Sequence, residues 1–184
     1  MAGLIMGFLV HGFGQWLPKM LENGGISAQS AGFMASIVSV AGIPSTLILP
    51  RAVPRRLIGR FLALFPVLAS AGILISAATS FWVVAGLILY GIAVAVLFPL
   101  LTVVLMDDPR VGPRSMGVAG AILFAFVQVG GSTGPMLMSI TVGATGSFLR
   151  GIWVLAAAGL LLAALTFALR ESKREPSVAP GAET

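Results

Sequence analysis

His11 and Gln15 are the first residues of the chain whose types and spacing could do chemistry. His11 is the only histidine, and it lies in a long apolar run with Gln15 four positions later. Side chains four residues apart project from the same face of a helix, and Trp16 follows directly. An ionisable group at membrane depth is a candidate for substrate or proton contact, because its desolvation must be offset by a partner. The alternative is a neutral imidazole that hydrogen-bonds a neighbouring helix, and the sequence leaves both open.

A second polar centre surrounds Gln128, a candidate substrate contact whose amide must find partners inside an apolar segment. The run GGSTGP, residues 130–135, follows it. Gly130 and Gly134 have the GxxxG spacing that lets two helix backbones approach closely, and Pro135 permits a bend. This pattern suits a gating helix that lines a cavity. It also suits plain helix packing, which is the more common role of such glycines.

Tyr90 and Pro99 mark another apolar segment, residues 81–106. Tyr90 brings one hydroxyl into it and is a candidate substrate contact, although a packing role explains an aromatic side chain at least as well. Pro99 is expected to kink the helix near its middle, because proline cannot complete the helical hydrogen-bond pattern.

The sequence contains no constellation that would support catalysis. There is one histidine and no cysteine, and every Asp and Glu lies outside the centres of the apolar runs. These counts exclude the usual catalytic dyads and triads and the usual metal clusters, as well as a buried carboxylate relay for protons. We therefore expect no enzyme activity, no cofactor and no metal.

The bilayer is the solvent that this composition requires. Hydrophobic residues make up 58% of the chain and charged residues 9%, against about 25% charged in soluble domains. The net charge of +5 could suggest nucleic acid. However, the basic residues lie between apolar runs instead of forming one face, so membrane topology explains them and no nucleic acid is expected.

Six segments are long and apolar enough to cross the hydrocarbon core, which takes about 20 residues. They are 1–17, ended by Pro18, and 31–49, 62–78, 81–106, 116–142 and 151–169. Ser27 or Ser30 could cap the second helix, and Thr79 and Ser80 would form a minimal turn. We expect an all-α domain of six transmembrane helices over residues 1–169. Residues 170–184, with charges and two prolines, are expected to be a disordered cytoplasmic tail.

Residues 50–60, PRAVPRRLIGR, set the expected orientation. Pro50 and Pro54 should prevent a smooth helix, so we expect a short cytoplasmic loop. Its basic residues are Arg51, Arg55, Arg56 and Arg60. With this loop inside, nine basic residues fall on the cytoplasmic side and two on the other. This bias predicts a multi-pass protein of the cytoplasmic (inner) membrane with both termini in the cytoplasm. Because Met1 stands directly on an apolar run, we also expect that upstream sequence is missing.

Three motifs resemble the major facilitator superfamily, and among its members the C-terminal half of the cyanate and nitroimidazole transporter branch. They are GQWLPKMLENGGISAQSAGF at 14–33, LFPLLTVVLMDDP at 97–109 and GGSTGPMLMSI at 130–140. The basic loop after the second segment and the minimal turn after the third fit one half of such a transporter. The loop departs from the superfamily pattern G-x-x-x-D-R-x-G-R-R, because residues 50–60 contain no aspartate.

The resemblance implies a secondary transporter that moves a small solute by alternating access. The first and fourth segments would line the cavity, the second and fifth would form the moving interface, and the third and sixth would be peripheral. His11 on the cavity-facing helix would suit an organic or inorganic anion or a hydrogen-bonding solute. The implied partner is an N-terminal six-helix half or a second half-size chain. The alternative is a membrane-embedded accessory or assembly protein without a transport path.

Overall fold

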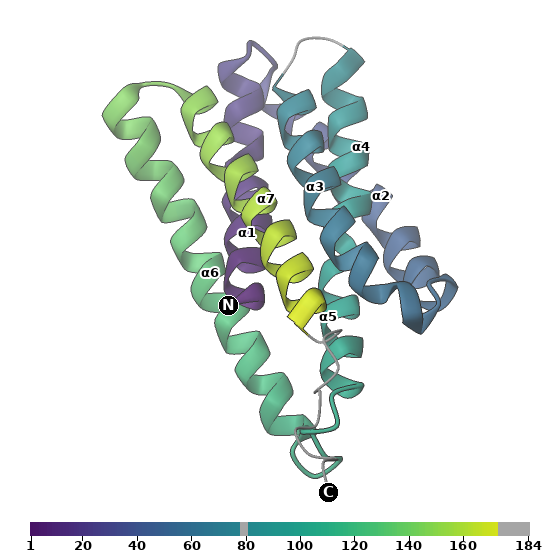
Figure 1. The fold of residues 1–184 in the computed structure, drawn as a ribbon. Coiled ribbons are helices and arrows are strands. Elements are labelled where there is room, and N and C mark those ends of the chain that lie inside the picture. The colour runs from purple at the N-terminus through teal and green to yellow at the C-terminus, as the bar shows by residue number, and fades with distance from the viewer. Residues whose placement is uncertain (78–80, 173–184) are drawn as a thin grey trace, which may run out of the picture.

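The computed structural model describes residues 1–77 and 81–172, and the regular secondary structure of this part of the chain is all helical (Figure 1). It confirms the predicted all-α membrane fold class. The helices are α1 (Ala2–Asn23), α2 (Ala28–Ala52), the short 3-10 helix η1 (Arg55–Leu57), α3 (Ile58–Ser76), α4 (Phe81–Ala95), α5 (Leu97–Met106), α6 (Met116–Thr145) and α7 (Phe148–Ser172).

The long helices form one bundle in which two groups of helices meet. Helix α1 packs against α6 and α7, and α4 packs between α2 and α3. Contacts of α3 with α7 and of α1 with α2 join the two groups, as the ribbon shows (Figure 1). The core lies between them and is made of aliphatic and aromatic side chains such as Leu9, Phe13, Leu87 and Leu155.

Five helical segments of the described chain are long and apolar enough to cross a membrane. They are Ala28–Ala52, Arg55–Ser76, Trp82–Met106, Met116–Thr145 and Phe148–Ala168. Helix α1, where the sequence predicts the first span, is not among them. It carries His11, Gln15 and Lys19 along with several glycines, and it buries one face against α6 and α7. A helix largely covered by protein needs less apolar surface than one surrounded by lipid, and this can explain the lower hydropathy of α1. That α1 spans the membrane stays a prediction.

The sequence predicts that the first helix ends at Pro18, but α1 continues through this proline to Asn23. Leu17 and Leu21 lie on either side of the proline and are only 2% and 6% exposed. Burial of two leucines contributes about 1.5–3 kcal/mol each. This is enough to offset the cost of about 3 kcal/mol for proline within a helix.

The basic loop is shorter than the predicted stretch 50–60. Pro50 lies inside α2, which ends at Ala52, and the interruption falls at Val53 and Pro54. The guanidinium of Arg51 donates a hydrogen bond of 2.7 Å to the carbonyl of Leu47, four residues earlier in α2. At the other end of α2, Ser27 is the N-cap, and its hydroxyl accepts from the Ser30 amide over 3.3 Å.

The fourth predicted segment is interrupted at Val96, between α4 and α5. Pro99, where the sequence predicts the kink, lies three residues later. Because Pro99 has no N–H, the carbonyl of Ala95 loses its helical donor. The hydroxyl of Thr46 on α2 donates to that carbonyl over 3.1 Å. The neighbouring helix therefore satisfies the group that the proline leaves free.

The last two helices are longer than predicted. Helix α6 runs through Pro135 to Thr145, and Gly146 closes it with a left-handed φ of 65°. Helix α7 begins at Phe148 and ends at Ser172, so residues 170–172 of the predicted disordered tail are helical. The remainder of that tail, 173–184, lies outside the described residues, as does the predicted turn at Thr79 and Ser80.

Helices α2 and α6 present most of their length outward. In the most apolar part of each helix, 11% of the residues are buried in α2 and 17% in α6, against 44% in the segment that contains α3. Large apolar side chains on these outer faces are widely exposed, including Phe33, Ile43, Val118 and Met136. These two faces therefore need lipid or another protein surface to cover them.

Candidate functional site

A glycine-lined contact between α1 and α6 positions the candidate site. A Cβ atom on Gly130 would collide with the backbone oxygen of Leu4, and one on Gly134 with that of Phe8. From the other side, a Cβ atom on Gly7 would collide with the backbone oxygen of Val127. The GxxxG pair therefore packs helix on helix at backbone distance. The gating role that the sequence suggested for this pair stays a prediction.

His11 lies directly on this contact. A Cβ atom on Gly131 would be 3.0 Å from His11 Nδ1 and 3.1 Å from its Cγ, so the absence of a side chain there leaves the space that the ring occupies. His11 Nδ1 is also 3.1 Å from the carbonyl oxygen of Gly7. A carbonyl oxygen can only accept, so Nδ1 carries the proton and donates. In the neutral ring, Nε2 is then a hydrogen-bond acceptor.

His11 and Gln128, two candidate substrate contacts that are far apart in the sequence, line the same recess. The recess has a volume of about 250 Å³, between α1, α4, α5 and α6. Its other described lining residues are all apolar: Met6, Val10, Val94, Phe98, Phe124 and Val127. The rings of Phe98 and Phe124 meet nearly edge to face, with centroids 6.4 Å apart. The recess thus combines an apolar wall with two polar residues in its lining.

Gln15 and Trp16 do not line this recess. Gln15 is exposed one helical turn farther along α1. The indole Nε1 of Trp16 donates to the carbonyl oxygen of Pro135 over 3.0 Å, and its ring packs against Phe148 with centroids 5.9 Å apart. Trp16 therefore ties α1 to α6 and α7, and Pro135 supplies the acceptor.

Tyr90 is a core residue and not a wall of the recess. Its side chain is 1% exposed. Its hydroxyl donates to the backbone oxygens of Leu9 and Val10 over 3.4 and 3.1 Å, and its ring lies 4.6 Å from that of Phe13. The packing role that the sequence left open is the one seen here, because the hydroxyl links α4 to the backbone of α1.

Substitution of Tyr90 by phenylalanine should lower the stability of the bundle without affecting a solute site. The change removes the hydrogen bonds to Leu9 and Val10, so we expect a loss of about 0.5–1.5 kcal/mol in the free energy of unfolding. Thermal unfolding of the purified protein in detergent measures it. Thr141→Ala is the control, because that hydroxyl bonds only the carbonyl of Leu137 within its own helix. Unchanged stability with lost uptake would instead assign Tyr90 to the solute.

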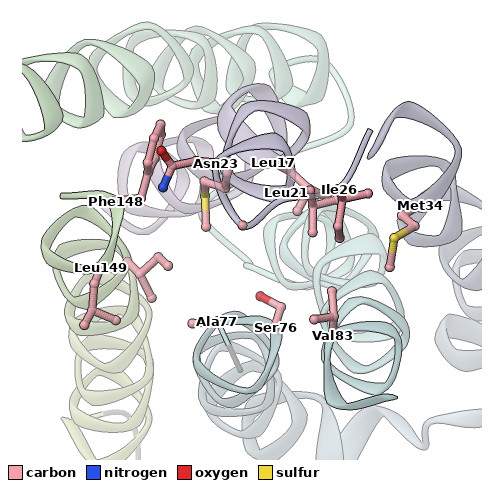
Figure 2. Close-up of a pocket in the computed structure, with 13 residues that line it drawn as sticks. Leu17, Leu21, Asn23, Ile26, Met34, Ser76, Ala77, Val83, Phe148 and Leu149 are labelled. Carbon is pink, nitrogen blue, oxygen red and sulfur yellow. The ribbon is translucent and has the colours of Figure 1, made fainter. Parts of the chain in front are cut away.

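A larger cavity of about 520 Å³ lies where the end of α1 meets α2, α3, α4 and α7 (Figure 2). Its polar side chains are those of Asn23 and Ser76, and the Ser76 hydroxyl already donates to the carbonyl of Ile73 over 2.7 Å. The other side chains that line it are apolar, Phe148 and Leu149 among them. Sequence reasoning missed this cavity, because it forms only where several helix ends converge. Because one of its two polar side chains, that of Ser76, already bonds its own helix, it is a weaker candidate than the recess at His11.

The predicted basic cluster is exposed at one end of the bundle. Its members are Arg51, Arg55, Arg56 and Arg60. Arg55 pairs with Asp107 at the end of α5, with 2.9 Å between Nη1 and Oδ1. Both side chains are substantially exposed, so the pair contributes little to stability. Within the described ranges, no three His, Asp or Glu residues lie close enough together to hold a metal ion.

Comparison with known proteins agrees with this architecture. The family model described as Major Facilitator Superfamily matches residues 1–135, which include α1 to α5, the recess and the α1–α6 contact. A search of the curated proteins finds no match. The family match extends over more than half of the 184 residues. The chain therefore belongs to the major facilitator superfamily.

Proposed function

We propose that the chain forms the C-terminal half of a secondary transporter, related to the cyanate and nitroimidazole branch, that moves a small solute across the cytoplasmic membrane. The observation that carries this proposal is the recess at His11 and Gln128. Its volume of about 250 Å³ is below the range of roughly 300–1,000 Å³ that is usual for complete ligand sites. A second six-helix half facing it would complete the site, as in transporters built from two related halves.

The packing of the helices supports a division of roles within this half. Helices α1, α4 and α5 would line the central cavity, and the exposed faces of α2 and α6 would meet the other half. Helices α3 and α7 would form a rigid support. The Ser70 hydroxyl donates to the carbonyl of Ala156 over 2.9 Å, and the Thr166 hydroxyl to that of Leu62 over 3.2 Å. Buried hydrogen bonds between helices hold such a pair together. Alternating access would then move α2 and α6 against the partner.

The isolated chain should not transport, because half of the cavity wall is absent and the recess would face lipid. Reconstitution into liposomes tests this, with a labelled panel of organic anions, cyanate and small neutral heterocycles. We expect no saturable uptake by the chain alone, and saturable uptake when it is produced together with a complementary six-helix half. Saturable uptake without a partner chain would contradict the proposal and indicate a homodimer of half-size chains.

The orientation can be tested at the end of α1 and at the end of α2. The bias of nine basic residues against two predicts that Ala52 lies in the cytoplasm and Asn23 outside. A single cysteine at Asn23 should react with an impermeant maleimide added to intact cells. A cysteine at Ala52 should react only after the membrane is opened. Equal labelling of both positions in intact cells would contradict the predicted topology.

A further inference from the structure

Two arginines at the start of α3 stand at one end of an apolar stripe that faces away from the bundle. The stripe consists of Leu64 and Val67, and the arginines are Arg56 and Arg60. We propose that Arg56 and Arg60, together with this stripe, bind an anionic lipid of the surrounding membrane. The proposal rests on the apolar, membrane-spanning character of the segment Arg55–Ser76 and does not depend on the proposed transport function.

The positive charges of Arg56 and Arg60 have no acidic partner among the described residues, and both side chains are exposed. At this end of the bundle, Asp107 already pairs with Arg55 over 2.9 Å, and the aspartate that follows it pairs within its own loop. A guanidinium at the end of a spanning helix lies at the depth of the lipid head groups. It can hold a phosphate there with two parallel hydrogen bonds. Two cationic groups are therefore available to the head group of a lipid.

The stripe on α3 supplies the apolar part of the site. Arg60, Leu64 and Val67 follow at spacings of four and three residues, which places them on one face of the helix. Leu64 is 48% and Val67 40% exposed, whereas Leu62 and Phe65 on the opposite face are buried in the core. The two exposed side chains lie about 6 and 10 Å beyond Arg60 along the helix axis. A lipid whose phosphate lies at Arg60 would thus have an acyl chain in contact with both.

The unpaired charge and the stripe together determine which occupant fits. A head group with a net negative charge gains from both arginines, and each basic side chain near the membrane surface raises the affinity by about fivefold. Phosphatidylcholine carries its own ammonium group and gains less. A soluble phosphate would meet the arginines but would leave Leu64 and Val67 without an apolar partner, so the stripe favours a lipid.

Quenching of a fluorophore by spin-labelled lipids tests this proposal. The chain has no cysteine, so Leu64→Cys carries a single bimane group at the stripe. The full chain is reconstituted into phosphatidylcholine vesicles. Phosphatidylglycerol or phosphatidylcholine with a nitroxide near the top of one acyl chain is then added in increasing amounts. Because each lipid is present in both leaflets, the result does not depend on the orientation of the chain.

Spin-labelled phosphatidylglycerol should reach half-quenching at a concentration about tenfold lower than spin-labelled phosphatidylcholine. When Arg56→Gln and Arg60→Gln are combined, the two concentrations should differ by less than about twofold. The matched control combines Arg110→Gln and Arg114→Gln, which removes the same formal charge from another exposed loop at this end of the bundle. It should keep most of the preference. Size-exclusion chromatography in detergent verifies that both variants are folded.

The parental chain alone can refute the proposal, because equal quenching by the two lipids would show that no anionic lipid is preferred. Retention of the preference after Arg56→Gln and Arg60→Gln would also refute it. An equal loss in the control variant would assign the preference to the overall charge of this end of the bundle, against a site on α3. Sodium phosphate that removes the preference, at an ionic strength at which sodium chloride preserves it, would identify a site for a soluble anion and likewise overturn the proposal.

Discussion

Replacement of Gly130 by alanine should prevent α1 and α6 from packing and leave little correctly folded protein. The added Cβ atom would collide with the backbone oxygen of Leu4 and would lie 2.8 Å from the amide nitrogen of Phe8. Both neighbours are backbone atoms, which cannot rotate away as a side chain can. Helix α1 would have to move away from α6, with loss of the packing that builds the recess.

Gly143→Ala is the matched control for this substitution. Gly143 lies in the same helix, and a Cβ atom there meets no atom within 4 Å. Alanine should be neutral or stabilise α6 by up to about 1 kcal/mol, because glycine is the poorer helix former. The monodisperse fraction after size-exclusion chromatography in detergent, together with the unfolding temperature, compares the two variants. Equal yields and equal unfolding temperatures would show that α1 and α6 are not packed at backbone distance.

Replacement of His11 by leucine should leave the protein folded and strongly reduce uptake in the complete transporter. Leucine is similar in volume to a neutral histidine and has no desolvation cost, so it satisfies a purely packing role. It cannot form a hydrogen bond, however, and a buried polar group of the solute left unpaired costs about 1–3 kcal/mol. We therefore expect uptake to fall by about fivefold to a hundredfold, and His11→Ala to reduce it strongly as well, with membrane expression maintained.

Initial rates of uptake, normalised to the protein in the membrane, measure the effect. Uptake by His11→Leu at the parental rate would identify His11 as a packing residue. The solute contact would then have to be sought around Gln128. A loss of folded protein in His11→Leu would instead point to the hydrogen bond with Gly7 as a structural one, and the unfolding temperature separates this case from a loss of binding.

The sequence by itself determined the class of the protein and the approximate position of its helices. With few charged residues, all of them near the predicted helix ends or in loops, the apolar segments can only be helices in a membrane. The Ser27 cap and the interruption near Pro99 also follow from local chemistry. Helix ends at Pro18 and Pro50 could not be predicted correctly. A prediction from local sequence includes the loss of the hydrogen bond that a proline removes from a helix. It does not include the burial of Leu17 and Leu21 by other helices, which compensates for that loss at Pro18.

Only the tertiary structure decided which polar residues share a site. His11 and Gln15 occupy one face of α1, yet His11 lines the recess together with Gln128, while Gln15 is exposed and Tyr90 is buried in the core. A helix that is apolar on all sides carries no periodic signal for the direction that its neighbour takes. That direction depends on where the backbones of two helices can come close together. In α1 and α6 this happens where Gly7 faces Val127 and where Gly130 faces Leu4. The composition could show that these helices pack, but only their contacts place His11 at the recess.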